Sequence, residues 1–399
     1  MAKASRQGVI QTSFPIPPGA WLGLLGGGQL GRMFCMAAQS LGYKVVVLDP
    51  GNHSPAGSVA DQHVHADYLD RAGLARLASL CRAATTEFEN VPASALEFLS
   101  RTAHVTPTAA SVAIAQDRIR EKNFLAEHGF GVVPFVVLES AAAAARVDAG
   151  LTPGIVKSAR LGYDGKGQIR VRTPQEVSAA FVAMGKVPCV LEKFVDLACE
   201  VSIIVARTAT GETTTWPVAE NRHRDGILDV SIVPARIDAD LAEKARDIAT
   251  RVANALDYRG VLCVEMFVTS EGALLVNEIA PRPHNSGHYT IDACVTSQFE
   301  QQARILAGLP LGNPRLHECA VMVNLLGDLW LDASDARREP DWASILSQPD
   351  VKLHLYGKGE PRRGRKMGHI TCLGATLPDA LRAARKVKQT LAIPGVDEL

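Results

Sequence analysis

The sequence contains two apolar runs, VLCVEMFV (261–268) and ALLVNEIA (273–280), separated by a short turn. Runs of this kind predict a β-hairpin. Each run contains one glutamate, Glu265 in the first and Glu278 in the second. In a hairpin these glutamates lie opposite each other, with Cβ atoms roughly 5 Å apart. Like charges at that spacing are unfavourable unless a cation lies between them, and paired carboxylates suit Mg²⁺ bound to nucleotide phosphates. The hairpin therefore predicts a chain that binds ATP.

The pairing of the two glutamates depends on the turn between the runs. We expect Glu271 and Gly272 to form a two-residue loop, which pairs Glu265 with Glu278. The alternative is a β-bulge that shifts the register by one residue and sends the carboxylates to opposite faces. The local sequence leaves both readings open.

Length and composition narrow the class of protein. The 399 residues exceed the size of a single core, so we expect two or three domains, and a hydrophobic fraction of 47% is ample for burial. Lysine plus arginine and aspartate plus glutamate both number 42, so the overall charge points neither to nucleic acid nor to an anionic membrane. No apolar stretch is long enough to span a bilayer. Residues 1–18 resemble no signal peptide, and we expect them to be a poorly ordered extension.

The eight cysteines are spread through the chain without CxxC pairs or ligand-like spacing to histidine. Scattered cysteines of this kind indicate reduced, mostly buried thiols in a cytoplasmic protein.

The organised chain opens with a strand at 21–26, a helix at 30–42 and a strand at 44–49, which predicts a βαβ unit with a parallel sheet. Gly26, Gly28 and Gly31 satisfy the pattern G-x-G-x-x-G that opens a dinucleotide-binding fold. An NAD-dependent oxidoreductase is therefore one hypothesis. The motif by itself shows only backbone amides at a helix N-terminus, which serve any phosphate-bearing substrate equally well.

A second glycine-rich segment, RLGYDGKGQIRV (160–171), lies between two predicted strands. Its glycines let backbone N–H groups close on phosphates, and Lys157 and Lys166 bracket them with positive charge. An ordinary glycine-rich hairpin is the alternative reading.

The order of these elements resembles the ATP-grasp superfamily. The resemblance begins with Lys157 and the glycine-rich loop, and it continues through Glu192 to Val195, Glu200, Glu265 and the pair Asn277-Glu278. Within that superfamily the chain is similar to the N5-carboxyaminoimidazole ribonucleotide synthetases of purine biosynthesis. This closer similarity is carried by GGGQLGRM (26–33), GYDGKGQ (162–168), APRPHNSGHYT (280–290) and RGRKMGH (363–369).

The resemblance implies a mixed α/β and α+β architecture with an ATP-grasp fold. We expect a Rossmann-like (pre-ATP-grasp) domain at 19–112 that binds the substrate phosphate, and an ATP-grasp domain at 113–312 with a lid subdomain at about 134–197. A small β-rich C-terminal domain at 313–399 would complete the active site.

The family reaction joins ATP, bicarbonate and 5-aminoimidazole ribonucleotide, and it yields the N5-carboxylated product, ADP and phosphate. By resemblance, Mg²⁺ would be held by Glu265 and Glu278, and the enzyme would be a homodimer that binds neither nucleic acid nor membrane. The residues expected around ATP are Arg118, Lys157, Gly162, Tyr163, Asp164, Gly165, Lys166, Gly167, Gln168, Glu192, Lys193, Phe194, Val195, Glu200, His223, Asn277 and Glu278.

The same resemblance implies the residues that carry out the carboxylation and bind the ribonucleotide. The expected catalytic residues are Tyr163, Asp164, Arg282, His284 and Lys358. The expected substrate-binding residues are Gly28, Gln29, Leu30, Glu87, Ser286, Arg365 and Lys366. Asp164 would accept a proton from the substrate amine, although an Asp-Gly pair is also a common turn. Arg365 and Lys366 would hold the 5-phosphate, although a charge run is more often a solvated face.

Two other classes of enzyme compete with this assignment. An NAD-dependent oxidoreductase leaves the second glycine loop, the paired acids and the basic cluster unexplained. Another ATP-grasp ligase or carboxylase shares ATP and Mg²⁺ but is not expected to combine HNSGHYT with GRKMGH.

Overall fold

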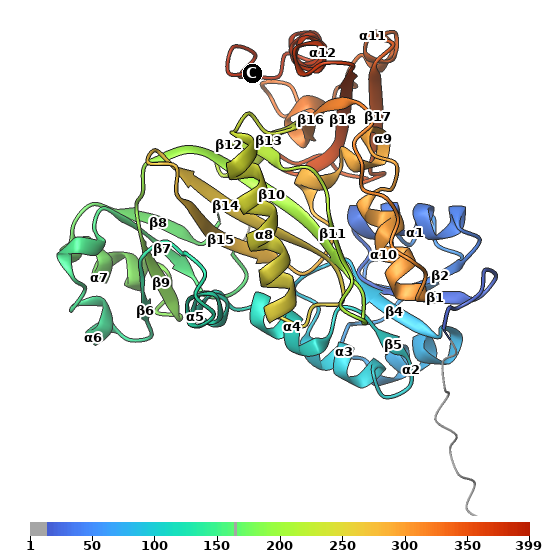
Figure 1. The fold of residues 1–399 in the computed structure, drawn as a ribbon, viewed down its shortest axis with the longest axis horizontal. Helices are drawn as coiled ribbons and strands as arrows, with labels where there is room; N and C mark the ends of the chain where they lie inside the picture. Colours follow the sequence, from blue (N-terminus) through green and yellow to red (C-terminus); the bar gives the residue numbers. More distant parts are fainter. Residues whose placement is uncertain (1–13, 163–165) are drawn as a thin grey trace, which may run out of the picture.

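The protein is described by a computed structural model, which covers residues 14–162 and 166–399. Within these residues the strands form three sheets, and Figure 1 shows how they are arranged along the chain. One sheet belongs to the N-terminal region, one to the region around 135–193, and the largest joins the centre of the chain to its C-terminal region. No helix in the part of the chain that the structure describes is long and apolar enough to cross a membrane.

The N-terminal region is a parallel sheet with helices around it. Its strands follow the order β3-β2-β1-β4-β5. The strands are β1 (Trp21–Leu25), β2 (Lys44–Leu48), β3 (Gln62–Val64), β4 (Ala83–Thr86) and β5 (His104–Val105). The helices are α1 (Gln29–Ser40), α2 (Arg71–Leu80), α3 (Ala93–Leu99) and α4 (Ala109–Ala115). The predicted βαβ unit is confirmed, because β1 and β2 pair in parallel with Trp21 opposite Lys44.

The predicted N-terminal extension ends earlier than residue 18. Residues 1–13 lie outside the described part of the chain. Ile16, however, is fully buried, and its backbone N–H donates to the carbonyl of Ala307 at 2.8 Å. Its carbonyl also accepts from the hydroxyl of Tyr43 at 2.7 Å. These contacts tie Ile16 to the folded body.

The predicted lid region contains a four-stranded antiparallel sheet, counted within the described residues, in the order β6-β9-β7-β8. Its strands are β6 (Phe135–Leu138), β7 (Gly154–Ser158), β8 (Gln168–Val171) and β9 (Cys189–Lys193), and its helices are α6 (Ala141–Ala144), η1 (Ala149–Leu151) and α7 (Pro174–Ala183). Helix α5 (Arg118–Glu127) contacts both β9 of this sheet and β15 of the large sheet. In Figure 1 the lid lies at one side of the molecule, with α5 at its base.

The large sheet follows the order β15-β14-β10-β12-β13-β16-β18-β17, and β11 also pairs with β10. Its central strands are β10 (Leu197–Arg207), β11 (Thr213–Thr215), β12 (Ala219–Arg224), β13 (Ile227–Val233), β14 (Gly260–Thr269) and β15 (Leu274–Ala280). Its C-terminal strands are β16 (Cys319–Leu326), β17 (Val351–Leu355) and β18 (Lys366–Gly374). The sheet thus runs across residue 312, and the domain boundary there stays a prediction.

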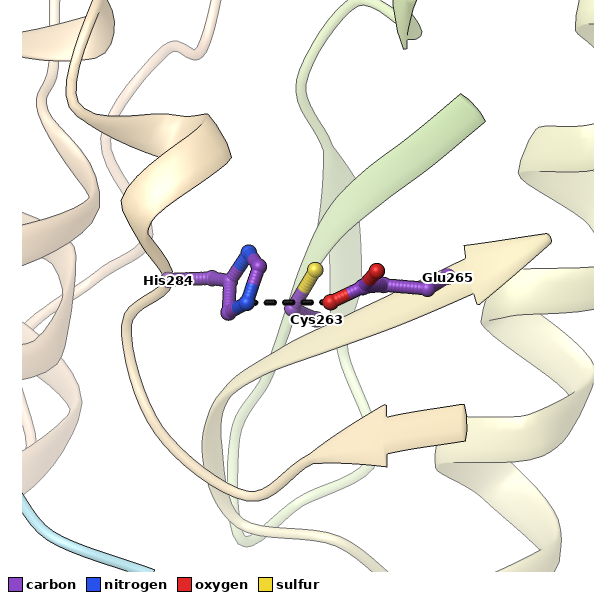
Figure 2. A group of neighbouring side chains, drawn as sticks. All are labelled: Cys263, Glu265 and His284. Atoms are coloured by element: carbon purple, nitrogen blue, oxygen red, sulfur yellow. Dashed lines mark ion pairs between the residues drawn. The ribbon is translucent and has the colours of Figure 1, made fainter. Parts of the chain in front are cut away.

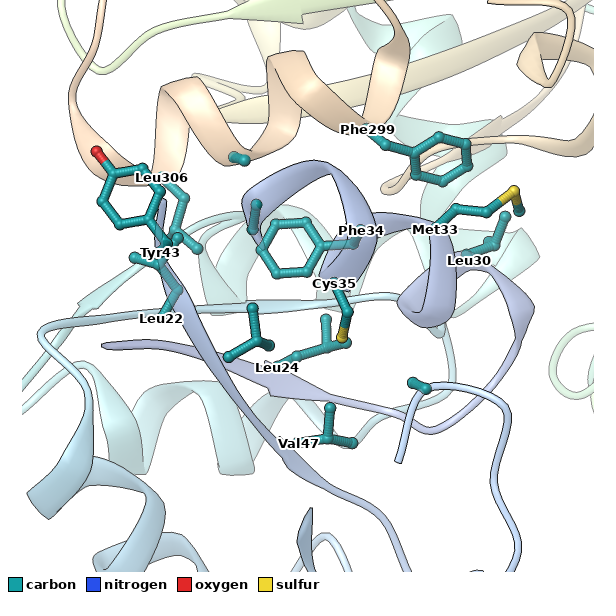
Figure 3. Close-up of a cluster of buried hydrophobic side chains, with 14 of the residues drawn as sticks. Leu22, Leu24, Leu30, Met33, Phe34, Cys35, Tyr43, Val47, Phe299 and Leu306 are labelled. Carbon is teal, nitrogen blue, oxygen red and sulfur yellow. The ribbon is translucent and has the colours of Figure 1, made fainter. Parts of the chain in front are cut away.

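Helices cover the large sheet and join it to the N-terminal region. They are α8 (Ala239–Ala255), η2 (Asn285–Gly287), α9 (Thr290–Ala293), α10 (Gln298–Ala307), η3 (Gly327–Trp330), α11 (Trp342–Leu346) and α12 (Leu377–Thr390). Helix α1 buries Leu30, Met33 and Phe34 at helical spacing. These side chains pack with Phe299 and Leu306 of α10, as Figure 3 shows. The shared core fixes the N-terminal sheet against the central region.

The hairpin that carries the two glutamates corrects the predicted turn. The N–H of Thr269 donates to the carbonyl of Ala273 at 2.9 Å, so the loop has three residues and not two. Gly272 has a φ of 81°, as a three-residue hairpin requires. A register shift follows at Asn277, and beyond it Glu265 pairs with Glu278. The predicted pairing is confirmed, whereas the two-residue loop is wrong.

Candidate active site

Three buried charges meet where the lid approaches α5. The Nζ atoms of Lys157 on β7 and Lys122 on α5 lie 2.6 Å and 3.2 Å from the carboxylate of Glu192 on β9. All three side chains are buried. Burial alone would raise the pKa of Glu192, but the two lysines hold it below its usual value. The structure therefore brings together Lys157 and Glu192, as the nucleotide-site prediction requires, and adds Lys122.

A second charged group lies beside the first, between α5 and β15. The guanidinium of Arg118 donates to Glu278 at 2.8 Å, and Oε1 of Glu121 accepts from the backbone N–H of Ile279 at 2.6 Å. Burial would raise the pKa of Glu278, but Arg118 and Lys157 lower it to about 2. Burial raises the pKa of Glu121 to about 8. Of these two acids, Glu278 is the one whose charge the neighbouring cations favour.

Several buried polar atoms around these charges lack hydrogen-bond partners among the described residues. They include Nη1 of Arg118, Nζ of Lys122, Oε1 of Glu192 and Oδ1 of Asn277. Lys122 and Glu192 form an ion pair whose geometry is not that of a hydrogen bond. Buried polar groups are normally satisfied, and orphaned ones indicate an unrecorded water, ion or ligand. Four such atoms lie at the junction of the lid and the large sheet, as expected for a site that binds a polar ligand.

The segment between β9 and β10 supplies the remaining predicted nucleotide contacts. The backbone N–H groups of Lys193 and Phe194 donate to the carbonyls of Pro134 and Pro153 at 2.9 and 2.8 Å, which fixes the linker that continues to Val195. Further along, Glu200 on β10 lies 3.1 Å from Nδ1 of His223 on β12. Burial would lower the pKa of His223, but the hydrogen bond and charge of Glu200 raise it.

The glycine-rich loop joins β7 to β8. Lys157 pairs with Gln168 at the base of this hairpin, and the N–H of Ser158 donates to the carbonyl of Gly167 at 2.9 Å. Gly162, Lys166, Gly167 and Gln168 are exposed. The predicted residues Tyr163, Asp164 and Gly165 lie outside the described part of the chain.

Glu265, one of the two paired glutamates, faces His284, as Figure 2 shows. Nε2 of the imidazole lies 3.0 Å from Oε1 of Glu265. The thiol of Cys263 lies beside them, and the potential ligand atoms of these three residues are within 4.8 Å of one another. Burial raises the pKa of Cys263 well above its usual value, so the sulfur is a thiol. The oxygens of Glu265 and Glu278 fit Mg²⁺ by donor type and by their cross-strand pairing.

The predicted bicarbonate residue Arg282 reaches the N-terminal region. Its Nε forms a short ion pair with Glu89, and its Nη1 donates to the carbonyl of Pro283 at 3.0 Å. Burial would raise the pKa of Glu89, but the charge and hydrogen bond of Arg282 hold it below its usual value. The structure thus places Arg282 and His284 next to the loop after β4.

Glu87 lies at the N-terminus of α1, where the substrate phosphate was predicted. Its two carboxylate oxygens accept from the N–H groups of Gly28 and Gly31 at 2.8 and 3.0 Å. Burial raises the pKa of Glu87. This arrangement corrects one detail of the prediction: the Gly28 amide is bonded to Glu87. Glu87 does not bond to the amides of Gln29 and Leu30. These two amides remain the predicted contacts for the substrate phosphate.

The basic cluster lies at the start of β18. Lys358 donates to the carbonyl of Lys366 at 2.7 Å, and Arg365 donates to the carbonyl of Glu360 at 2.7 Å. A Cβ atom at Gly357 would lie 3.7 Å from Nη1 of Arg32 on α1. The loop that carries Lys358 therefore approaches α1, the helix whose N-terminal amides bond to Glu87.

Sequence reasoning missed Lys122 and Glu121. Both lie within a turn of Arg118 on α5, and Lys122 follows it at the i+4 position on the same face. The available signal was a run of four ionisable residues within five positions, Arg118, Arg120, Glu121 and Lys122, at the start of this helix. The sequence alone does not show that this face is turned toward β9 and β15.

Comparisons with protein families agree with this arrangement. A ribonucleotide synthetase preATP-grasp domain matches residues 20–116, an ATP-grasp domain matches 123–299, and a phosphoribosylaminoimidazole carboxylase C-terminal domain matches 320–383. Fold and site together define an ATP-grasp protein with flanking pre-ATP-grasp and C-terminal domains. The predicted fold class is confirmed.

Individual relatives define the family more narrowly. An N5-carboxyaminoimidazole ribonucleotide synthase of Brucella melitensis is 48% identical over 359 residues, which is 89% of this chain and 97% of that protein. The chain belongs to the family of N5-carboxyaminoimidazole ribonucleotide synthases. A crystal structure of such a synthetase with ADP is 40% identical, with a TM-score of 0.86 over 94% of this chain and 98% of that one. A structure from Aspergillus clavatus with ADP and 5-aminoimidazole ribonucleotide is 31% identical, with a TM-score of 0.85 over 94% and 99% of the two chains.

Proposed function

We propose that this chain is an ATP- and bicarbonate-dependent ligase that carboxylates 5-aminoimidazole ribonucleotide on its exocyclic amine, with release of ADP and phosphate, in purine biosynthesis. The observation that carries the proposal is the group of buried ionisable side chains between the lid and the large sheet. This group places lysine and arginine side chains, which could bind phosphates, next to glutamates, which could bind a metal ion. The 48% identity to a named synthase over nearly the whole of both chains supports the same reaction.

ATP would bind at that junction. Together with Lys166 of the glycine-rich segment, Lys157 and Arg118 would offer positive charge to the phosphates. Their present partners, Glu192 and Glu278, would be shared with the nucleotide. The linker after β9 would contact the adenine. The backbone N–H groups of Lys193 and Phe194 are already bonded within the protein, so Val195 is the next residue whose backbone could contact the base. Glu200, paired with His223, would accept from ribose hydroxyls.

Mg²⁺ would be held by Glu265 and Glu278. When bound, such an ion neutralises the charge on the transferring phosphoryl group. Asn277 lies on β15 in the bulge next to Glu278. Its Oδ1, which has no hydrogen-bond partner among the described residues, would offer a further oxygen to the nucleotide site.

The carboxylation itself requires bicarbonate close to the γ-phosphate. An oxygen of bicarbonate attacks the γ-phosphorus and ADP leaves, which gives carboxyphosphate. The carboxyphosphate then delivers its carboxyl group to the amine, phosphate leaves, and the amine proton passes to a base, for which we propose Asp164. Arg282, His284 and Lys358 would surround the bicarbonate, since positioning and charge neutralisation carry most of such a transfer.

The ribonucleotide would lie between α1 and β18. The amides of Gln29 and Leu30 would bind its 5-phosphate together with Arg365 and Lys366, since a helix N-terminus favours an anion. Glu87 would meet its imidazole or ribose, and Ser286 would contact it from the other side. The approach of the Gly357 loop to Arg32 supports a site shared by these two regions.

We also propose a homodimer in the cytoplasm. The eight cysteines of the described residues are unpaired thiols, which is usual in a reducing compartment. A groove of about 450 Å³ between α1 and β17, lined by Met36 and Leu355, offers an apolar surface to a second copy. Sedimentation equilibrium would measure the mass of the particle directly.

The test is phosphate release from ATP, measured with and without aminoimidazole ribonucleotide and bicarbonate. The proposal requires release that depends on both co-substrates. Release that depends on a different acceptor would favour another ATP-grasp ligase, and binding of NAD without ATP turnover would favour the oxidoreductase.

A further inference from the structure

A chain of buried polar side chains crosses the large sheet and ends at His284. Ser231 on β13 bonds to Asn221 on β12 at 2.8 Å, and Asn221 bonds to Ser202 on β10 at 2.8 Å. Ser202 bonds to Ser286 at 2.7 Å, and Ser286 lies 2.9 Å from Nδ1 of His284. The side chains of these four residues are almost completely buried, with exposures of 1% or less except at Asn221, which is exposed at 4%.

Two groups of Ser286, its backbone N–H and its hydroxyl, act on Nδ1 of His284 and favour a proton on Nε2. The N–H of Ser286 donates to Nδ1 at 3.3 Å, because His284 caps the short helix η2. A backbone N–H cannot accept, so Nδ1 is the acceptor and the proton of the neutral ring is on Nε2. That N–H points at Oε1 of Glu265, 3.0 Å away, as Figure 2 shows.

The directions of the other bonds agree with this tautomer. Ser231 donates its hydroxyl proton to the Asn221 carbonyl, and the Asn221 amide donates to Oγ of Ser202. The hydroxyl of Ser202 then donates to Oγ of Ser286, so the proton of Ser286 is left for Nδ1 of His284. Turning the Asn221 amide over would reverse every bond and set Nδ1–H against the backbone N–H of Ser286. The backbone N–H of Ser286 therefore selects one direction for the whole chain.

The register of the sheet places this chain beside the paired glutamates. Ser202 pairs with Glu265 across β10 and β14, and Asn221 pairs with Ser231 across β12 and β13. Buried hydroxyl and amide groups cost stability unless all are bonded. Because every member of this chain is bonded and the chain ends at His284, its bonds constrain the position of the imidazole ring.

We propose that Ser202, Asn221 and Ser231 are positioning residues that hold His284 as the Nε2–H tautomer. His284 then acts through its single Nε2–H as a hydrogen-bond donor, to Glu265 in this structure and to an oxygen of bicarbonate when Glu265 holds the metal, and not as the base that removes a proton. The statement about bicarbonate rests on the proposed function, whereas the statement about the tautomer does not. The proton acceptor of the reaction is accordingly a different group.

The test combines NMR with kinetics on the full-length enzyme. Histidine labelled with ¹⁵N reports the tautomer of each ring, and His284→Gln identifies the signal of His284. The expected result in the enzyme without nucleotide is an Nε2–H ring in the wild type and a mixture of tautomers in Ser202→Ala. We expect kcat to fall roughly tenfold in Ser202→Ala, since one neutral hydrogen bond is worth on the order of 1 kcal/mol. The KM for ATP should stay constant.

Two further variants keep the proposal falsifiable. Ser231→Ala removes the far end of the chain and should shift the tautomer in the same direction, even if Ser202→Ala does not fold. Ser111→Ala removes an equally buried hydroxyl that bonds to Thr108, outside the chain, and should change neither readout. An Nδ1–H ring in the wild type would overturn the proposal, and so would Ser202→Ala with the tautomer and kcat of the wild type. If the enzyme carboxylates a different acceptor, the tautomer result still decides the positioning role.

Discussion

Glu265 and Glu278 face each other because two irregularities of the hairpin compensate. The turn contains one residue more than a two-residue loop, and the register shift at Asn277 takes up that difference before the glutamates are reached. Either irregularity alone would send one carboxylate to the opposite face of the sheet. The bulge also turns the side chain of Asn277 into the site, where its Oδ1 is buried without a partner among the described residues.

The first prediction concerns these two acids. Glu278→Gln should abolish turnover, and Glu265→Gln should lower it less, because each change removes one charge from a site for Mg²⁺ that needs both. Burial would raise the pKa of Glu278, but Arg118 and Lys157 lower it to about 2, which favours the charged carboxylate. Steady-state turnover against Mg²⁺ concentration measures the effect.

Glu243→Gln is the matched control, because Glu243 is an exposed acid on α8 that pairs with Arg246. It should leave turnover unchanged, and circular dichroism should show all three variants folded. Wild-type activity of Glu278→Gln at ordinary Mg²⁺ would exclude the metal assignment.

The second prediction concerns the 5-phosphate. Arg365→Ala should raise the KM for aminoimidazole ribonucleotide at least tenfold, because a charge-assisted hydrogen bond is worth about 1.5–3 kcal/mol. The KM for ATP should hardly change. Arg363→Ala is the control, because the guanidinium of Arg363 is already paired with Asp335 at 2.7 Å.

Gly28 provides an independent test of the same site. A Cβ atom there would lie 2.7 Å from Oε1 of Glu87, so Gly28→Ala displaces that carboxylate from the helix N-terminus. The expected result is again a raised KM for the ribonucleotide. NAD binding that Gly28→Ala removes, with ribonucleotide kinetics intact, would support the dinucleotide reading instead.

The third prediction concerns Asp164, whose role comes from the family resemblance, since the residue lies outside the described part of the chain. Asp164→Asn should reduce product formation roughly a hundredfold or more, as expected when a general base is lost. Nucleotide affinity, measured by calorimetry, should change little. Weakened ATP binding with full turnover at saturation would show that Asp164 only shapes the loop.

The fourth prediction concerns pH and two buried histidines, His288 and His369. Burial holds the pKa of both rings well below the usual value of 6.5, and the charges of His354 and, for His288, Lys366 act in the same direction. Below pH 6.5 the unfolded chain therefore binds protons that the folded chain does not, so stability falls as the pH falls. Each ring should contribute about 1.4 kcal/mol per pH unit once its unfolded form is fully protonated.

His369→Gln isolates one of these contributions. The Gln side chain can still bond to the hydroxyl of Tyr356, which lies 3.0 Å from Nδ1 of His369. Denaturant unfolding between pH 5 and pH 7 should show a shallower loss of stability in this variant than in the wild type. Identical slopes would mean that His369 binds a proton equally in the folded and unfolded chain.

Features that depend on residues close together in the chain could be predicted from the sequence. The βαβ unit follows from its apolar runs, and the pairing of Glu265 with Glu278 follows from two strands joined by a short turn. The contact of Glu87 with Gly28 joins segments 59 residues apart, which local patterns do not constrain. Ser202, Asn221 and Ser231 come from three strands whose order in the sheet is set by tertiary packing, so their alignment could not be foreseen.

The most direct measurement of the proposed reaction follows the carboxyl carbon. The purified enzyme would be given ¹³C-bicarbonate, ATP, Mg²⁺ and aminoimidazole ribonucleotide, and the products would be analysed by ¹³C NMR and by ADP determination. We predict one ¹³C-labelled carbamate on the exocyclic amine for each ADP formed, and no labelled product when ATP is omitted. Formation of ADP without labelled product, or labelling that does not require ATP, would contradict the proposed function.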